Sequence, residues 1–419
     1  MTAGWLVLVE SNTTGSGRLF CRAARRLGLL PVLFARDPGR YPYVRQDGVA
    51  ARVLDTGDPA AVLAGCAALP GPVRGVTSSS EYSVATAAEV AGRLGLPHPD
   101  PDAVRGCRDK PTQRARLRAA GLPGPAAAAA ATPDDAVAVA VDIGLPVVVK
   151  PVAGSGSLGV RRCAARAEVR AAAGAVLGGL PGLPAQPAVL VEAYLPGPEF
   201  SVETADQWVV GIVAKHLGPL PWFIETGHDF PASLPAADRE ALAGAAVAAL
   251  RALGLGWGAA HVELRLTPDG PRVVEVNPRL AGGMIPRMVE EATGIDLVGR
   301  QVARAVGEPG PPRPTRAAAA AIRFLVNTTP GRLVDVRGME PARQVPGVVE
   351  VGVLAVPGQE LRVRHSFQDR LAYVVARGPG DEPAAAGAAA GQALRRITAV
   401  VAAPAARRDP PVIRPGRRG

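Results

Sequence analysis

The chain has 419 residues, which is enough for roughly two to four structural units that each bury a core. Its formal net charge of +10 suggests a polyanionic partner, but no dense basic run with interleaved aromatic residues accompanies that charge. We therefore attribute the charge to arginine use over a mixed surface and expect no nucleic-acid partner. No charge-free apolar span reaches the about 18 residues of a membrane helix, so we expect no membrane partner either.

The first 105 residues alternate apolar runs with helical patterns. Three predicted strands and two predicted helices share this region: 5–9, 30–35, 73–78, 18–28 and 85–94. Alternation of this kind predicts a parallel sheet with helical crossovers, and hence a small open α/β domain. The loop 11–17 is the place for a dinucleotide fingerprint, but its glycines do not match G-x-G-x-x-G.

The middle of the chain mixes helices and strands around a glycine-rich loop at 154–159. Helices are expected at 109–120, 134–143 and 235–254, and strands at 147–150, 189–192, 200–203 and 208–213. The strands 260–266 and 272–276 are joined by Thr267-Pro-Asp-Gly270, which predicts a hairpin.

The run PGPPRPT after Glu308 marks a boundary. Beyond it, strands at 317–326, 348–356 and 371–376 predict a smaller β-rich domain. The basic, proline-broken tail from residue 401 to 419 is expected to be disordered.

The cysteines and the N-terminus bear on the compartment. Cys21, Cys66, Cys107 and Cys163 are far apart and form no CxxC pair, which argues against a zinc site and for a reducing compartment. The N-terminus MTAGWLVLVESN has no cationic leader and only five apolar residues in a row, which argues against a signal peptide. We therefore expect a cytoplasmic protein.

Lysine is rare in this chain, with only Lys110, Lys150 and Lys215 among 47 basic side chains. These positions are candidates for chemistry that needs a compact charge on a flexible stem. Lys150 ends an apolar strand just before Gly154-Ser-Gly-Ser-Leu-Gly159, a loop whose free backbone N–H groups suit a phosphate. The loop is either an ordinary turn or a phosphate cradle. It is not a P-loop, because the chain contains no Gly-Lys pair.

The hairpin carries a second candidate site. Glu263 and Glu275 lie six residues either side of Asp269, so they are expected to face each other with Cβ atoms roughly 5 Å apart. Asn277 and Arg279 follow at i+2 and i+4 and would share that face. Two carboxylates and an amide oxygen suit Mg²⁺ with phosphate, and Arg279 could grip a phosphate or carboxylate. The alternative is a surface hairpin with solvated charges.

With these features, residues 105–308 resemble the ATP-grasp superfamily, which includes biotin carboxylase, glutathione synthetase and D-alanine–D-alanine ligase. Four segments show this resemblance: RDKPTQRARLRAAGLPGP, Lys150 with the glycine-rich loop 154–159, VEAYLPGPE and the carboxylate hairpin. The resemblance implies ATP and Mg²⁺, or Mn²⁺ in its place, as cofactors. The implied phosphate ligands are Lys110, Lys150, Gly154, Ser155, Gly156 and Ser157. The implied adenine and ribose contacts are Glu192, Tyr194, Leu195 and Glu199. The implied metal ligands are Glu263, Glu275 and Asn277.

Over about residues 1–378 the chain is also similar to the L-amino acid ligase branch, which joins a carboxylate to an amine. NPRLAGGMIPRMVEEATGIDL and KHLGPLPWFIETGHDFPASLP resemble that branch's signature and substrate loop, and ESNTTGSG, DPGRYPYV and SFQDRLAYVVARG add to the likeness. The substrate contacts expected from these segments and from strand position are Lys215, His216, Glu225, His228, His261, Arg279, Gly282 and Gly283. Two alternatives remain open, a solvent-facing Lys215 and a structural His261. The segment 126–142 matches weakly, and the tail does not match.

The resemblance implies an α/β (α+β) fold in five segments. They are an N-terminal pre-ATP-grasp domain (1–105), ATP-grasp lobe A with the glycine loop (106–188), lobe B with the metal site (189–308), a C-terminal domain (309–400) and the tail (401–419).

The implied function is ATP-dependent ligation through an acyl phosphate, with Lys150 and Arg279 as catalytic residues and small-molecule carboxylate and amine substrates. A homodimer is the implied assembly. The base that takes the proton from the amine is not identified, and the candidates are His261, His216, His228 and Glu225. The alternatives are a bicarbonate-activating carboxylase and a non-catalytic nucleotide-binding protein.

Overall fold

The computed structural model describes residues 4–12, 16–308 and 310–403. From residue 404 onward the expected tail lies outside the described residues. Its expected start is two residues too early, because strand β19 (Thr398–Ala402) runs to residue 402. Within the described part, no helix is long and apolar enough to cross a membrane.

The N-terminal sheet is parallel, as expected, with strand order β3-β2-β1-β4. Its strands are β1 (Trp5–Val9), β2 (Leu30–Ala35), β3 (Ala50–Val53) and β4 (Val73–Thr77). Side chains of β1 alternate between the two faces. Leu6 and Leu8 pack with helix α1 (Ser16–Arg26), and Val7 and Val9 pack with α3 (Pro59–Ala67) and α4 (Val84–Arg93).

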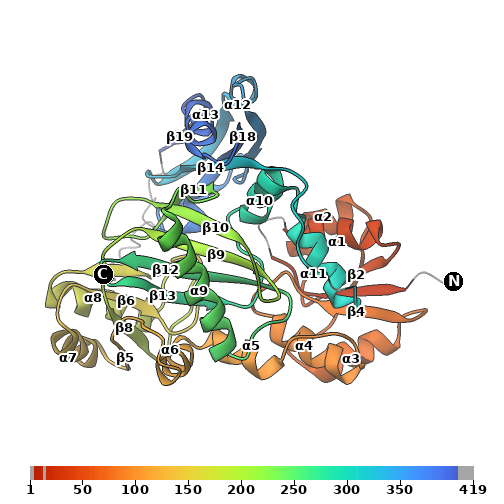
Figure 1. Ribbon diagram of the computed structural model, residues 1–419, viewed down its shortest axis with the longest axis horizontal. Helices are drawn as coiled ribbons and strands as arrows, with labels where there is room; N and C mark the ends of the chain where they lie inside the picture. The colour runs from red at the N-terminus through yellow and green to blue at the C-terminus, as the bar shows by residue number, and fades with distance from the viewer. Residues whose placement is uncertain (1–3, 13–15, 309, 404–419) are drawn as a thin grey trace, which may run out of the picture.

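Helix α11 (Leu297–Ala305) corrects one expected boundary. We expected residues 189–308 to belong to lobe B, but Val298 and Val302 of α11 share a buried cluster with Leu6, Leu8 and Phe20. In Figure 1, α11 lies beside α1 on the side of the N-terminal domain. The N-terminal core is therefore completed by a helix nearly 300 residues further along the chain.

Lobe A is built on an antiparallel sheet of order β5-β8-β6-β7. The strands are β5 (Ala127–Ala130), β6 (Val147–Pro151), β7 (Arg161–Cys163) and β8 (Val189–Ala193), and helices α7 (Pro133–Ile143) and α8 (Arg166–Gly178) pack on them. The expected boundary at 188 is wrong, because β8 pairs with both β5 and β6 and so belongs to lobe A. The connection to lobe B follows β8.

An eight-stranded sheet of order β13-β12-β9-β10-β11-β14-β18-β16 forms the centre of the molecule. The lobe B strands are β9 (Glu199–Ala205), β10 (Trp208–Leu217), β11 (Glu225–Phe230), β12 (Ala259–Thr267) and β13 (Gly270–Asn277). Helix α9 (Ala236–Ala252) crosses the front of this sheet in Figure 1. It buries Leu242 and Leu250 against Val202, Val262 and Leu264.

The C-terminal strands do not form a wholly separate sheet. Strands β14 (Ala318–Val326), β16 (Val348–Val353) and β18 (Arg370–Pro379) continue the central sheet through the β11–β14 pairing. A second, three-stranded sheet contains β15 (Gly331–Arg337), β17 (Glu360–Leu361) and β19. Helices α12 (Met339–Arg343) and α13 (Ala384–Leu394) complete this end of the molecule. Lobe B and the C-terminal segment are therefore joined by backbone hydrogen bonds.

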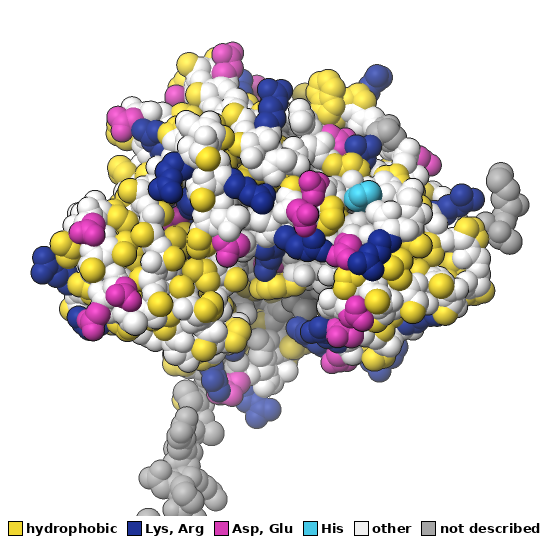
Figure 2. Space-filling view, turned by 90° about the horizontal axis from the view of Figure 1, so that it is seen from below, with side chains coloured by type: hydrophobic (Ala, Val, Ile, Leu, Met, Phe, Trp, Pro, Cys, Tyr) yellow, Lys and Arg dark blue, Asp and Glu magenta, His cyan; other side chains and the backbone are white. Residues whose placement is uncertain are grey.

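Basic side chains lie next to acidic ones on the face shown in Figure 2, without a single continuous basic patch. On this face, therefore, charges of both signs are mixed.

The packing of α9 on the sheet can be tested at Leu250, which is fully buried. We expect Leu250→Ala to lower the free energy of unfolding by about 2–5 kcal/mol, because it removes buried methyl groups and leaves a cavity. Val141→Ala, at an exposed position on α7, should change it by less than about 0.5 kcal/mol. Urea unfolding followed by circular dichroism measures both, and equal losses would contradict this assignment of the core.

Candidate active site

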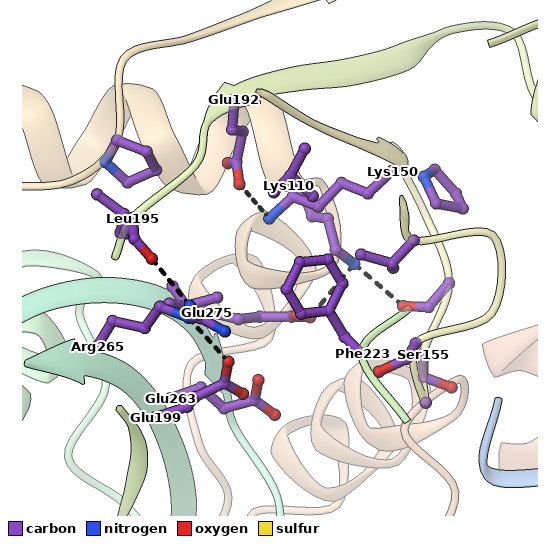
Figure 3. Close-up of a pocket in the computed structure, with 18 of the residues that line it drawn as sticks. Lys110, Lys150, Ser155, Glu192, Leu195, Glu199, Phe223, Glu263, Arg265 and Glu275 are labelled. Atoms are coloured by element: carbon purple, nitrogen blue, oxygen red, sulfur yellow. Dashed lines mark hydrogen bonds and ion pairs between the residues drawn. The ribbon is translucent and has the colours of Figure 1, made fainter. Parts of the chain in front are cut away.

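A cavity between lobes A and B collects most of the predicted site residues (Figure 3). Figure 3 shows Lys110, Lys150 and Glu192 on one side, Glu199, Glu263 and Arg265 on the other, and the Phe223 ring between them. The predicted residues that line it are Lys110, Lys150, Gly154, Ser155, Gly156, Ser157, Glu192, Tyr194, Leu195, Glu199, Lys215, Glu225, Glu263 and Glu275.

Lys110 is placed by the start of helix α6 (Lys110–Ala119). The Asp109 carboxylate caps the helix by accepting a hydrogen bond from Thr112 N, which fixes Lys110 at the first helical position. Its Nζ lies 3.0 Å from the carbonyl oxygen of Gly154 and 3.2 Å from Glu275 Oε1. One lysine thus contacts both the glycine-rich loop, 154–159, which we call the flap, and the carboxylate hairpin.

Lys150 lies on the cavity face of β6, because Val147 and Val149 occupy the opposite, buried face. Its Nζ is 2.6 Å from Glu192 Oε2, and Arg114 Nε is 2.6 Å from the other oxygen of Glu192. Burial lowers the pKa of Lys150, and the Glu192 carboxylate opposes this effect. Burial would raise the pKa of Glu192, but Lys150 and Arg114 outweigh it and lower that pKa to about 2. Glu192 therefore anchors Lys150 at the cavity edge.

The hairpin pairs the two predicted carboxylates, but through a register shift that was not predicted from the sequence. Thr267 pairs with Gly270 at the turn, and a bulge between Glu263 and Leu264 then shifts the pairing by one residue. Glu263 of β12 is paired directly with Glu275 of β13. Both carboxylates line the cavity, and each has a lysine partner: Glu263 Oε2 is 3.2 Å from Lys215 Nζ, and Glu275 Oε1 is 3.2 Å from Lys110 Nζ. Asn277 lies beside Glu275 in an adjoining cavity that Lys110 and Gly154 also line.

Lys215 is the most enclosed of the three lysines, with a side chain only 2% exposed. Its Nζ lies 2.6 Å from Glu199, 2.9 Å from Glu225 and 3.2 Å from Glu263. Burial would lower the pKa of Lys215, but the three carboxylates outweigh burial and hold it well above its usual value. The alternative of a solvent-facing Lys215 is wrong, because carboxylates from β9, β11 and β12 surround its ammonium.

His261 does not act as a free base in this arrangement. Its Nδ1 is 2.7 Å from Glu203 Oε1, and its Nε2 is 3.0 Å from Glu263 Oε1. Burial alone would lower the pKa of the ring, but Glu203 and Glu263 outweigh burial and raise it to about 9. With both ring nitrogens bonded to carboxylates, His261 holds Glu263 in place. Its predicted place among the substrate contacts is corrected: His261 lies behind Glu263.

Arg279 is held by a residue that sequence reasoning missed. Its Nε and Nη2 lie 2.9 Å and 2.6 Å from Glu81 Oε2, and Arg108 Nη1 lies 2.9 Å from Glu81 Oε1. Burial would raise the pKa of Glu81, but Arg279 and Arg108 outweigh burial and lower it. The N-terminal domain therefore supplies the carboxylate that orients Arg279 at the edge of the cavity that Asn277 lines.

Glu225 and His228 form the part of the site nearest the C-terminal segment. Arg370 donates to the side chain of Glu225 at 2.8 Å and to its backbone carbonyl. His228 is fully buried, and burial lowers its pKa to about 3, so its ring is neutral at physiological pH. Gly283 lies against His228 and Arg370. A Cβ at this position would be 3.0 Å from His228 Nε2 and 3.3 Å from Arg370 Nη1.

Two predicted substrate contacts lie away from the cavity. His216 follows Lys215 on β10, so its side chain points to the opposite face, where its Nε2 is 2.7 Å from Asp229. Gly282 is exposed, and nothing lies within 4 Å of where its Cβ would be. Both residues were predicted from the family resemblance of the segments that contain them. Strand alternation directs His216 away from the site, and the loop leaves Gly282 exposed.

Arg265 and Phe223 are cavity residues that the sequence reasoning missed. Arg265 Nε lies 3.1 Å from Glu199 Oε2, and its Nη1 donates to the Leu195 carbonyl at 2.8 Å. A signal for Arg265 was available, because His261, Glu263 and Arg265 alternate with apolar residues along one strand. Phe223 belongs to a loop, where no periodicity marks a side chain as facing a site.

Three family models match this chain. They describe an ATP-grasp N-terminal domain over residues 21–98, an ATP-grasp domain over 143–287 and an L-amino acid ligase C-terminal domain over 323–402. A Sinorhizobium fredii protein described as uncharacterized protein y4rH is 37% identical over 376 residues, which cover 89% of this chain and 78% of that protein. The chain belongs to the ATP-grasp superfamily, in its L-amino acid ligase branch. The resemblance inferred from the sequence and the mixed α/β fold class are confirmed.

Two further proteins are similar to this ATP-grasp chain. Carnosine synthase 1 of Gallus gallus is 37% identical over 135 residues, which span 31% of this chain and only 14% of the synthase. The crystal structure of an L-amino acid ligase from Bacillus licheniformis matches with a TM-score of 0.78 over 95% of this chain and 99% of that one. Their sequence identity is 24%, so that likeness shows the fold alone. Family membership supports ATP-dependent carboxylate–amine ligation as the general reaction.

The paired state of His261 predicts a pH-dependent stability. The folded pKa of about 9 exceeds the usual 6.5, so the folded ATP-grasp chain binds the extra proton between these values. We expect the contribution of His261 to the free energy of unfolding to be complete below pH 6.5. It should fall by up to ~1.4 kcal/mol per pH unit as pH rises toward 9.

Urea unfolding of the wild type and His261→Gln across this pH range measures the effect. The variant should show a shallower fall. Identical slopes would contradict a protonated His261.

Proposed function

We propose that this chain is an ADP-forming ligase that activates the carboxylate of an amino acid as an acyl phosphate and joins it to an amine. The observation that carries the proposal is the cavity in which Lys110 and Lys150 face the paired carboxylates Glu263 and Glu275. Phosphoryl transfer needs little covalent help from a protein, because it depends on positioning and on charge stabilisation. The lysines and carboxylates that line this cavity provide both.

The donor chemistry of the hairpin fits a hard divalent cation. The two carboxylates lie in direct cross-strand register, and oxygen donors of this kind suit Mg²⁺ or Mn²⁺. Lys215 and Lys110 already offset part of their charge, so the support for a metal comes from the donor type and the shared register. Glu263 and Glu275 would hold the ion, with Asn277 beside Glu275 as the third ligand. When bound, such an ion offsets charge on the phosphates of ATP.

The side chains of lobe A would bind and orient the nucleotide. Lys150, anchored by Glu192, and Lys110, which bonds the Gly154 carbonyl, place two ammonium groups where the triphosphate would lie. Tyr194 and Leu195 line the cavity beyond Glu192 and would contact adenine. Glu199 would accept from the ribose hydroxyls, with its orientation fixed by Lys215 and Arg265.

Arg279 would hold the substrate carboxylate and then the acyl phosphate. A guanidinium that is already held at two nitrogens by Glu81 loses little freedom when it binds a second oxyanion. The amine then attacks the acyl carbon, an amide forms, and phosphate leaves. Two candidates for the amine's proton acceptor, His228 and Glu225, are weak bases in this arrangement. Burial lowers the pKa of His228 to about 3, and although burial would raise the pKa of Glu225, Lys215 and Arg370 outweigh it and hold that pKa well below its usual value.

The proposal also includes the cellular compartment, the substrate class and the oligomeric state. All four cysteines are buried free thiols, which suits a reducing cytoplasm. Small-molecule carboxylate and amine substrates, and a homodimeric assembly, remain predictions from the family resemblance.

The assignment of the hairpin is tested by Glu275→Gln, which keeps the shape and removes one charge. We expect ATP turnover with Mg²⁺ and a pool of amino acids to fall by at least about 100-fold, because transition-state charge is no longer offset. Phosphate release and the mass of the product report the reaction. The product should be lighter by one water than its two parts.

Glu340→Gln is the matched control, because Glu340 is exposed on α12 and pairs only with Arg343 among the described residues. It should keep wild-type turnover. Normal turnover in Glu275→Gln would refute the metal assignment, and a product that requires bicarbonate would identify a carboxylase instead.

A further inference from the structure

One short segment of the C-terminal domain reaches the active site at three points. It runs from His365, after β17, to Arg370, the first residue of β18, and we call it the clasp. It includes the 3₁₀ turn η2 (Phe367–Asp369), which connects directly to β18 of the central sheet. No residue of the clasp was predicted as a site residue from the sequence.

The first contact is with the flap. Phe367 N donates to the Gly156 carbonyl at 3.3 Å, and the Phe367 ring covers the α-carbon of Gly156 so closely that a Cβ there would overlap the ring. Gly156 also has a φ of +65°, which favours glycine. The flap carries a glycine at this point partly because an aromatic ring from another domain lies on it.

The second contact is with the loop between β10 and β11. The rings of His365 and Trp222 stack with centroids 4.1 Å apart and planes 3° from parallel. The same loop reaches lobe A, where Arg162 N donates to the Pro221 carbonyl at 2.9 Å. The clasp thus touches two segments that line the cavity, the flap and the loop that carries Phe223.

The clasp itself is held rigidly. The buried Asp369 carboxylate accepts hydrogen bonds from the backbone N–H groups of Arg364 and Ser366, and the Asp369 carbonyl accepts from Asn327 N at 2.7 Å. Arg370 then bonds Glu225 inside the site. A rigid turn tied to the central sheet is a fixed point against which a flexible glycine flap can close.

We propose that Phe367 is a positioning residue that holds the flap closed over the acyl phosphate. The inference rests on the proposed ligase function. An acyl phosphate loses its phosphate either to the amine, which gives the amide, or to water, which returns the carboxylate and free phosphate. A flap held shut by Phe367 excludes water during the interval before the amine attacks.

The test compares Phe367→Ala with the wild type by two readouts. Phe367 is partly exposed, so the variant is expected to fold with nearly unchanged thermal stability. The amount of amide formed per ATP cleaved should fall by at least about tenfold, because the intermediate is exposed to water. Hydrogen exchange of the flap amides, with Mg²⁺ and a non-hydrolysable ATP analogue, should be faster in the variant.

The controls separate this role from general damage. Trp208→Ala removes an exposed aromatic side chain at the start of β10 and should change neither readout. Phe367→Leu, which keeps an apolar contact with Gly156, should restore most of the coupling between ATP cleavage and amide formation.

Unchanged coupling and unchanged flap exchange in Phe367→Ala would overturn the proposal. The exchange measurement does not require turnover, so it still tests the clasp if the proposed ligase activity fails.

Discussion

Lys215 of β10 lies within 3.2 Å of carboxylates from β9, β11 and β12, so one buried ammonium joins four strands of the central sheet. Ionised groups are costly to bury, and their removal from water is offset only when their partners are close and well oriented. Here each of the three carboxylates also has a second cationic or imidazole partner: Arg265 for Glu199, Arg370 for Glu225 and His261 for Glu263. The site is therefore one connected electrostatic unit.

The central sheet supports that unit because its two faces differ. On β12, His261, Glu263 and Arg265 share the polar face, with Glu263 and Arg265 lining the cavity and His261 behind Glu263, while Val262 and Leu264 pack under α9. The same alternation runs along β9, whose polar residues Glu199, Ser201 and Glu203 pair in register with the three of β12. Burial of the apolar face fixes the register, because a slip of one residue would turn charges into the core. The hydrophobic core thus determines where the charges lie.

Segments distant in sequence complete the site. Glu81 from the N-terminal domain orients Arg279, and Arg370 from the C-terminal segment orients Glu225. The clasp adds contacts to the flap and to the β10–β11 loop. In each case a residue outside the ATP-grasp lobes fixes a group inside them. This arrangement explains why the N-terminal and C-terminal regions belong to the same functional unit as the lobes.

The sequence by itself determined the local structure: the parallel N-terminal strands, the hairpin that carries Glu263 and Glu275, the lysine before the flap and the family that these features define. The bulge that brings Glu263 directly opposite Glu275 was visible only in the structure. Periodicity and turn chemistry act over a few residues, so they can be read from the chain. Only the tertiary structure decided that β8 belongs to lobe A, that α11 completes the N-terminal core, that His261 is held by Glu203, and that His216 faces away from the site. Each of these depends on which strands and helices become neighbours. That choice is made by the burial of apolar surface from the whole chain, which no local pattern contains.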